Sequence, residues 1–194
     1  MKSPLVVLKL GGAQARRGRL GEWLDAAARC AGRLVVVPGG GPFADVVRAM
    51  QAEIGFDEAA AHEMAMSQFG RALVSLRPGF ELAASGEALQ EALARGVTPV
   101  WSPERMALEA GLAPSWDLTS DSLAAWLAGR LGAERLILVK HGEAASAAEL
   151  ARRGVVDPLF PAFLARSGAR AFLAPPDAAQ GLDAGVFPEI GQEP

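Results

Sequence analysis

Glycine residues follow two apolar stretches near the start of the chain. The first stretch contains Lys9 and runs into Gly11 and Gly12, and the second runs into Gly39–Gly41. Because glycine has no Cβ, successive backbone N–H groups can turn toward one anion and approach it closely. Lysine adds a compact positive charge that suits a phosphate group. We therefore interpret both segments as phosphate-handling loops.

Polar residues also stand at two later places. Thr119, Ser120 and Asp121 open a helical stretch, and Lys140 and His141 follow another apolar run. In an open parallel sheet, ligands bind beyond the carboxyl ends of the strands. We therefore expect these side chains at the same edge of the sheet as the glycine loops.

The elements that must position these residues alternate between strand and helix. The expected strands are 5–10, 33–37, 80–84, 97–101, 135–139 and 170–174, and the expected helices are 20–31, 57–76, 87–94, 119–131, 147–153 and 160–167. A further helix should start at Pro42, and 106–114 should be irregular or a short helix. This alternation predicts a mostly parallel sheet with helices on both faces, a three-layer α/β/α sandwich.

Composition and length limit the class of protein. The chain has 194 residues, of which 51% are hydrophobic, with a net charge of −3 and one cysteine. The length suits one domain, and one cysteine excludes an internal disulfide framework. No apolar run approaches the roughly 20 residues of a membrane span. We expect a cytoplasmic protein that binds neither membranes nor nucleic acid, since no wide basic stripe is present.

Several well-known site motifs are missing. The chain contains no Walker loop and no dinucleotide-binding G-x-G-x-x-G after the first strand. Cysteine and histidine spacing typical of a metal site and the G-x-S-x-G serine motif are also absent. The phosphate loops are therefore of another kind.

Four segments, in order, resemble the amino acid kinase superfamily. They are 7–12 (VLKLGG), 35–43 (VVVPGGGPF), 119–124 (TSDSLA) and 136–139 (LILV). The superfamily includes acetylglutamate, aspartate, uridylate, carbamate and isopentenyl phosphate kinases. Residues 116–121 (WDLTSD) and the short chain look most like small uridylate-kinase-like enzymes of methanofuran or methylofuran biosynthesis. These convert (aminomethyl)furanylmethyl phosphate to the diphosphate.

The resemblance implies a phosphotransferase that uses ATP and Mg²⁺ and forms a homo-oligomer. Residues 1–118 would be the acceptor-binding half of one domain and 119–194 a shortened nucleotide-binding half. Lys9 would neutralise charge on the transferring phosphoryl group, and Asp121 would orient Lys9. Mg²⁺ would be carried by ATP, without a protein metal site. The expected nucleotide-binding residues are Gly11, Gly12, Lys140 and His141, and the expected acceptor-binding residues are Gly39, Gly40, Gly41, Thr119 and Ser120.

The chain also departs from the family pattern. Ala13 replaces the usual serine of the first loop, and no lysine follows Lys140, although the family's second lysine normally comes later. Either Lys140 takes that role from a new position, or catalysis is weak or absent. The alternatives are a uridylate or isopentenyl phosphate kinase and a non-catalytic ligand-binding or storage protein.

A few other residues have a structural and a functional interpretation. Arg16, Arg17 and Arg19 could be a solvated loop or contact an anionic substrate. His62 fits a helix surface or an acceptor contact, and Trp116 a loop anchor or a stacking platform. Asp157, before a proline, suggests a turn, with Mg²⁺ or ribose as the alternative partner.

Overall fold

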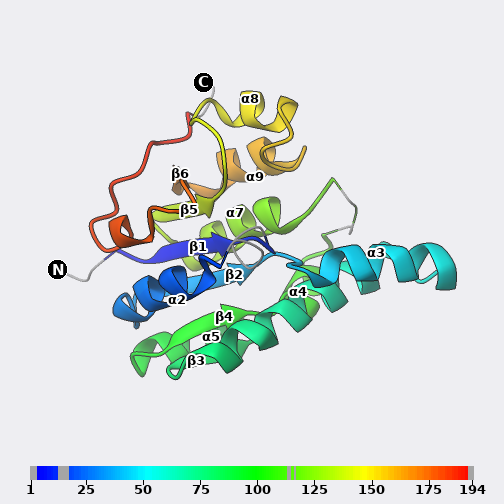
Figure 1. The fold of residues 1–194 in the computed structure, drawn as a ribbon, viewed down its shortest axis with the longest axis horizontal. Helices are drawn as coiled ribbons and strands as arrows, with labels where there is room; N and C mark the ends of the chain where they lie inside the picture. Colours follow the sequence, from blue (N-terminus) through cyan, green and yellow to red (C-terminus); the bar gives the residue numbers. More distant parts are fainter. Residues whose placement is uncertain (1–3, 13–17, 113–114, 116, 192–194) are drawn as a thin grey trace.

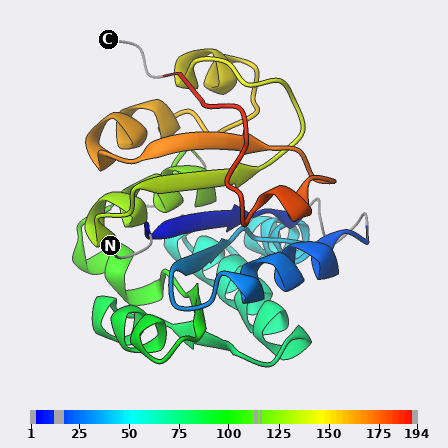
Figure 2. The same cartoon turned by 90° about the vertical axis from the view of Figure 1, so that its left-hand side faces the viewer.

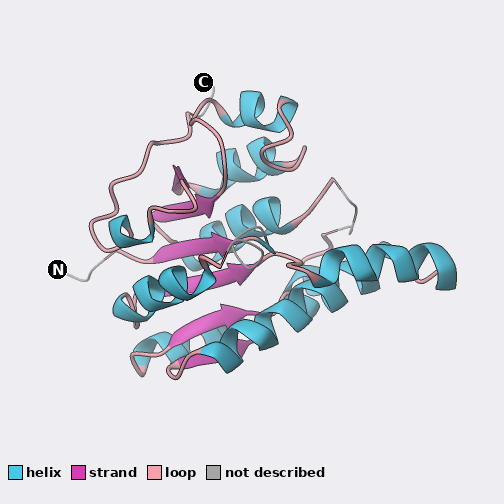
Figure 3. Cartoon of the chain, in the orientation of Figure 1, coloured by secondary structure: helices cyan, strands magenta, loops and turns pink. Residues whose placement is uncertain are grey.

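A six-stranded parallel sheet runs through the part of the chain that the structure describes (Figure 1). The structure is a computed structural model and describes residues 4–12, 18–112, 115 and 117–191. The strand order is β3-β4-β2-β1-β5-β6, every neighbouring pair is parallel, and the strands are drawn in magenta in Figure 3. The strands are β1 (Val6–Leu10), β2 (Leu34–Pro38), β3 (Phe80–Ala83), β4 (Thr98–Trp101), β5 (Arg135–Val139) and β6 (Arg170–Ala174).

The register aligns the carboxyl ends of the three central strands. Leu10, the last residue of β1, pairs with Pro38 of β2 on one side and with Val139 of β5 on the other. The segments that follow these three strands therefore leave the sheet at one place. This is the edge at which the sequence places its glycines and lysines.

Helices cover both faces of the sheet, as the quarter-turn view in Figure 2 shows. Helices α5, α7 and α9 pack on one face, and α2 and α4 pack on the other. Helix α3 packs on α4 and extends beyond the carboxyl ends of the strands (Figure 1). The helices are α2 (Leu20–Arg29), α3 (Phe43–Ile54), α4 (Glu58–Leu76), α5 (Gly86–Ala94), α6 (Glu104–Glu109), α7 (Ser120–Leu131), α8 (Ala147–Arg152), α9 (Phe160–Ser167) and the 3₁₀ helix η1 (Ala179–Gly181).

Strand alternation divides the interior into two cores. Val7 of β1 packs with α7 and α9, whereas Leu8 and Leu10 pack with α2 and α4. Since successive side chains of a strand point to opposite faces, Lys9 lies on the same face as Val7, toward α7. The strand thereby directs a buried lysine at the helix that carries Asp121.

The predicted three-layer α/β/α class is confirmed, and the predicted elements match the observed ones to within about two residues. One boundary differs: α3 begins at Phe43, one residue after Pro42, although the φ of −65° and ψ of −19° of Pro42 are already helical. The stretch expected at 106–114 as irregular or a short helix contains the short helix α6, which runs from Glu104 to Glu109. Among the described residues, no helix has the length and apolar character needed to span a membrane.

Candidate active site

The two glycine loops pack backbone against backbone. A Cβ on Gly12 would lie 2.5 Å from the Cα of Gly41, and one on Gly39 would lie 3.3 Å from the Cα of Gly11. The N–H of Gly39 donates to the carbonyl of Leu10 at 2.8 Å, which joins the loops at their bases. No larger residue fits at Gly12 without moving the second loop. The absence of side chains therefore lets the backbones of the two loops lie in direct contact.

Gly41 is constrained in two further ways. Its φ of +57° lies in the left-handed region, which a residue with a Cβ adopts at a cost. A Cβ at this position would also lie 2.5 Å from the ring of Phe69 on α4. Phe69 of α4 therefore leaves no room for a side chain at Gly41. Glycine satisfies both the left-handed backbone conformation and this close contact.

One buried carboxylate joins two lysines at the end of the sheet. The Nζ of Lys9 lies 3.0 Å from Oδ1 of Asp121, and these side chains are only 7% and 4% exposed. The Nζ of Lys140, which follows β5, donates to Oδ2 of the same carboxylate and to the carbonyl of Val155. Asp121 lies in the first turn of α7. Two cations from adjacent strands are therefore held side by side by one acid.

The electrostatics of this cluster favour an ionised acid. Burial alone would raise the pKa of Asp121, but the positive charges of Lys9 and Lys140 outweigh it and lower that pKa. The pKa of Lys140 is lowered by burial and by the like charge of Lys9, and Asp121 offsets part of this effect. The cluster carries two lysines and one carboxylate, so it attracts an anion.

Asp157 caps the helix that carries Asp121. Its Oδ2 accepts hydrogen bonds from the N–H of Thr119 at 3.1 Å, the hydroxyl of Thr119 at 2.9 Å and the N–H of Ser122 at 3.0 Å. Its Oδ1 accepts from the hydroxyl of Ser122. The cap of α7 is therefore supplied by a distant acid, and the side chain of Thr119, the residue before the helix, makes no cap bond of its own. With these four bonds, Asp157 fixes the start of α7 and so the position of Asp121.

Two pockets meet at Lys9, Gly11 and Gly12. The first, which we call the Gly39 pocket, has a volume of about 400 Å³ and is lined by Lys9, Gly11, Gly12, Gly39, Gly40, Gly41, Ala44, Asp45, Arg48 and Ser120. The second, the Lys140 pocket, has a volume of about 380 Å³ and is lined by Lys9, Gly11, Gly12, Val139, Lys140, His141, Gly154 and Val155. The shared wall places one lysine and one glycine loop within reach of both pockets.

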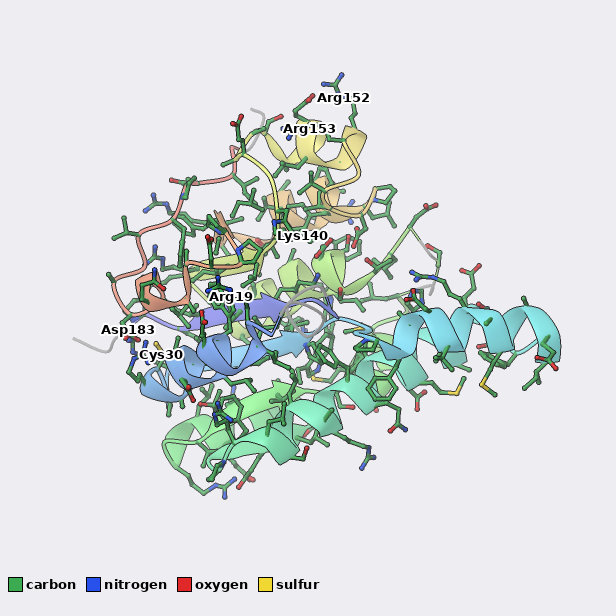
Figure 4. The ribbon with its side chains drawn as sticks, viewed as in Figure 1. Arg19, Cys30, Lys140, Arg152, Arg153 and Asp183 are labelled. Atoms are coloured by element: carbon green, nitrogen blue, oxygen red, sulfur yellow. The ribbon has the colours of Figure 1, made fainter. Side chains whose placement is uncertain are left out.

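A third hollow extends the Lys140 pocket. It has a volume of about 250 Å³, and Lys140 and His141 line it as well. Arg19, which precedes α2, also lines it, and Figure 4 labels Arg19 and Lys140. Gly142, Pro175, Pro176 and Asp177 complete the lining. The Lys140 pocket and this hollow therefore lie on either side of Lys140 and His141, which line both.

The structure brings together almost all of the residues singled out from the sequence. Lys9, Asp121, Lys140, His141, Ser120 and both glycine loops lie in or beside the two pockets. Thr119 lines neither pocket, since its hydroxyl is bonded to Asp157. His62 is half-buried on α4, where burial lowers its pKa. Ala13, Arg16, Arg17 and Trp116 lie outside the described residues.

Sequence reasoning missed two residues of the Gly39 pocket. Asp45 and Arg48 follow the second glycine loop on the first turns of α3 and line the pocket. Their spacing of three residues on a helix places both on one face, and this signal was present in the sequence. Among the described residues, no three histidine, cysteine or acidic side chains form a cluster that would hold a metal ion.

Comparisons with solved structures show that the fold is shared with known proteins. The fold is similar to uridylate kinase from Archaeoglobus fulgidus, with 19% identity, a TM-score of 0.74, and coverage of 96% of this chain and 100% of that chain. It is also similar to UMP kinase from Ureaplasma parvum, with 14% identity, a TM-score of 0.69, and coverage of 97% of this chain and 98% of that one. UMP kinase from Bacillus anthracis gives 14% identity, a TM-score of 0.65, and coverage of 98% and 97%.

Identities this low establish a shared fold and nothing more. None of the curated proteins matches the sequence. The model of the amino acid kinase family matches residues 4–143, which include both glycine loops, Asp121 and Lys140. Because this match spans most of the chain, the protein belongs to the amino acid kinase family.

Proposed function

We propose that the protein transfers a phosphoryl group from ATP to a small acceptor that already carries a phosphate. One observation carries the proposal: Lys9, Gly11 and Gly12 form a wall common to two pockets. A group that moves between two bound molecules must pass a point that both can reach. Membership of the amino acid kinase family supports the same class of reaction.

The two pockets suit different molecules. The Lys140 pocket continues into the hollow beside Arg19, and this length suits a nucleotide with its phosphates at Lys140. The Gly39 pocket would take the acceptor, with the acceptor phosphate near Lys9. An oxygen of that phosphate would attack the γ-phosphorus of ATP as the bond to the β,γ-bridging oxygen breaks, which yields ADP and a diphosphate.

The protein's part in this reaction is electrostatic. In this proposal Lys9 and the glycine-loop N–H groups other than that of Gly39 stabilise the charge that builds up on the transferring group. Asp121 keeps Lys9 there, and its own position is set by Asp157. Mg²⁺ would arrive with the ATP phosphates and add positive charge.

Lys140 takes the place of the family's later lysine in this proposal. It follows β5, shares Asp121 with Lys9 and lines the Lys140 pocket. A cation at this point can neutralise the nucleotide phosphates from the side opposite the acceptor. The positive charge of the family's later lysine is then kept in this chain, but it is supplied from a different position, Lys140.

Replacing Lys140 by methionine should weaken nucleotide binding. We expect the KM for ATP to rise about tenfold, since one charge-assisted contact to phosphate is lost. Folding should be little affected, because Asp121 keeps Lys9 as a partner. The measurements are steady-state kinetics and the melting temperature.

The matched control for this variant is Arg152→Met. Arg152 lies on α8, is 77% exposed and points away from the sheet in Figure 4. The Arg152→Met substitution also removes one positive charge, and it should leave the KM for ATP unchanged. An unchanged KM in Lys140→Met would return Lys140 to a structural role.

For the acceptor we propose (aminomethyl)furanylmethyl phosphate, converted to its diphosphate in methanofuran or methylofuran biosynthesis. The support is the resemblance of the WDLTSD segment and the short chain to that group of kinases. UMP is the main competing acceptor, because the similar structures include kinases named for uridylate. Isopentenyl phosphate is the third candidate.

Incubation with Mg-ATP and each of the three acceptors tests the function. ADP and the diphosphate product would be followed by mass spectrometry. We expect product with the furan phosphate and little with UMP or isopentenyl phosphate. A different preferred acceptor would overturn the substrate assignment. The absence of acceptor-dependent ADP with all three would overturn the kinase proposal and favour a ligand-binding member of the family.

A further inference from the structure

One carboxylate lines the hollow beside Lys140 and has no partner within the protein. Asp177 follows β6 and lines that hollow together with Arg19, Lys140 and His141. Its side chain is exposed, and none of the residues that the structure describes forms an ion pair or a hydrogen bond with its carboxylate. We propose that Asp177 binds the ribose hydroxyl groups of the donor nucleotide and so makes the protein select a ribonucleotide. The inference rests on the proposed function, since it takes the phosphates of ATP to lie at Lys140.

The charges around the two cavities favour this assignment. Within the described part of the chain, the Lys140 pocket is lined by Lys9 and Lys140 and by no acidic residue, so it suits phosphate groups. The hollow differs because Asp177 lines it. A carboxylate repels a phosphate, but its two oxygens accept hydrogen bonds from two neighbouring hydroxyl groups. An uncharged group with vicinal hydroxyls therefore suits the hollow better than a further phosphate does.

The position of the hollow matches the order of groups in a nucleotide. Lys140 and His141 line both cavities, so a ligand with its phosphates in the Lys140 pocket places its next group in the hollow. In ATP that group is the ribose. The hollow has a volume of about 250 Å³, which is large enough for a furanose ring. Arg19 and Lys140, labelled in Figure 4, keep positive charge beside the α-phosphate that joins the ribose to the rest of the ligand.

The turn that carries Asp177 is held by its backbone and not by this side chain. The indole N–H of Trp23 donates to the carbonyl of Pro176 at 2.8 Å. The N–H of Ala178 donates to the carbonyl of Pro175 at 3.0 Å, which closes the turn. Two successive prolines also restrict the backbone, because each ring fixes its own φ. The carboxylate of Asp177 is therefore presented from a fixed turn, which lowers the entropy lost when a ligand binds.

The other acid for which the sequence allows a ribose contact is already occupied. Both carboxylate oxygens of Asp157 accept hydrogen bonds from Thr119 and Ser122 at the start of α7. Among the described residues that line the Lys140 pocket and the hollow, Asp177 is the only acid. The contact with ribose that Asp157 does not make is thus assigned to Asp177.

A purely structural role for Asp177 predicts something different. Aspartate is common in turns, and an exposed turn residue contributes little to stability. In that case Asp177→Ala would change the melting temperature by at most about 2 °C and leave the choice of nucleotide unchanged. The two roles are therefore separated by nucleotide selectivity and not by stability.

The test is a calorimetric titration with Mg-ATP and with Mg-2′,3′-dideoxy-ATP, without acceptor. The two probes have the same base and triphosphate and differ in the two ribose hydroxyl groups. We expect the unmodified protein to bind ATP at least about tenfold more tightly, because the dideoxy probe loses its hydrogen bonds to a charged acceptor. Asp177→Ala should weaken ATP to about the affinity of the dideoxy probe. The dideoxy probe itself should bind this variant at least as tightly as it binds the unmodified protein, since a repelling charge is removed.

Glu143→Ala is the matched control. Glu143 is an exposed acid in the segment after β5 and lines neither the Lys140 pocket nor the hollow. This control should retain the preference for ATP.

The outcomes separate the inference from the proposed function. Equal binding of both probes by the unmodified protein, or a preserved preference in Asp177→Ala, would overturn the inference and leave ATP as the donor. Binding of neither probe would overturn the proposed function together with the inference. Selective binding of ATP that depends on Asp177, with no phosphoryl transfer to any of the three acceptors, would support the ribose assignment and overturn the proposed kinase activity.

Discussion

Replacing Lys9 by methionine is expected to lower kcat by about two to three orders of magnitude. Methionine has a similar length and no charge, so the change removes the cation from the wall that both pockets share. The loss should fall on kcat more than on either KM, because this charge matters most when the phosphoryl group is between donor and acceptor. Single-turnover measurements of product formation would isolate that step.

The fold should tolerate this change well enough for the kinetics to be interpreted. Asp121 retains Lys140 as a partner, and a methionine suits the buried position beside α7. Arg95→Met is the matched control, since it removes a positive charge from an exposed pair with Glu81, away from both pockets. A folded Lys9→Met protein with normal kcat would contradict the mechanism even if the enzyme class proved correct.

The sequence predicted most of this site because strand ends are easy to find. An apolar run that ends in glycine marks both a buried strand and a loop, and parallel strands bring such loops to one edge. Lys9 and Lys140 follow from that rule, since β1 and β5 are neighbours in register. The likeness of residues 119–124 to the family then identified Asp121 as the acid that orients Lys9, whereas its contact with Lys140 was not predicted.

Other parts of the site depend on contacts that local patterns do not encode. Asp157 caps α7 from 38 residues away, where the sequence alone indicates a turn before proline. The hydrogen bond from Lys140 to the carbonyl of Val155 likewise depends on the path of the chain after α8, which brings Val155 next to the end of β5. Such contacts are set by the packing of the whole domain, and they decide which polar groups remain available to a ligand. The hydroxyl of Thr119, a predicted acceptor-binding residue, is bonded to Asp157 in the structure.

Replacing Asp121 by asparagine should impair both stability and activity. The change leaves two buried lysines facing each other without an anion. Removing one partner of a buried pair typically costs about 3–5 kcal/mol, and each kcal/mol lowers the melting temperature by roughly 2–4 °C at this chain length. We expect a drop of about 6 °C or more, together with a fall in kcat of at least about 100-fold as Lys9 loses its orientation.

A second substitution separates the two effects. Adding Lys140→Met to Asp121→Asn returns the net charge of the cluster to its original value, with one lysine in place of two lysines and an acid. We expect this double variant to regain part of the lost melting temperature and none of the lost kcat. Recovery of kcat would show that Asp121 acts through stability alone.

The pH dependence of the Asp121→Asn variant supplies an independent check. Burial and Lys9 already lower the pKa of Lys140, and Asp121 offsets this effect more than Asp157 does. Without Asp121 the pKa of Lys140 in the folded protein should fall further below its unfolded value of about 10.4. The unfolded state then binds more protons than the folded state, so the variant's stability should rise with pH up to about 10.4. Melting temperatures of variant and unmodified protein should therefore converge between about pH 7 and pH 10, and a gap that stays constant across this range would contradict the assigned charge cluster.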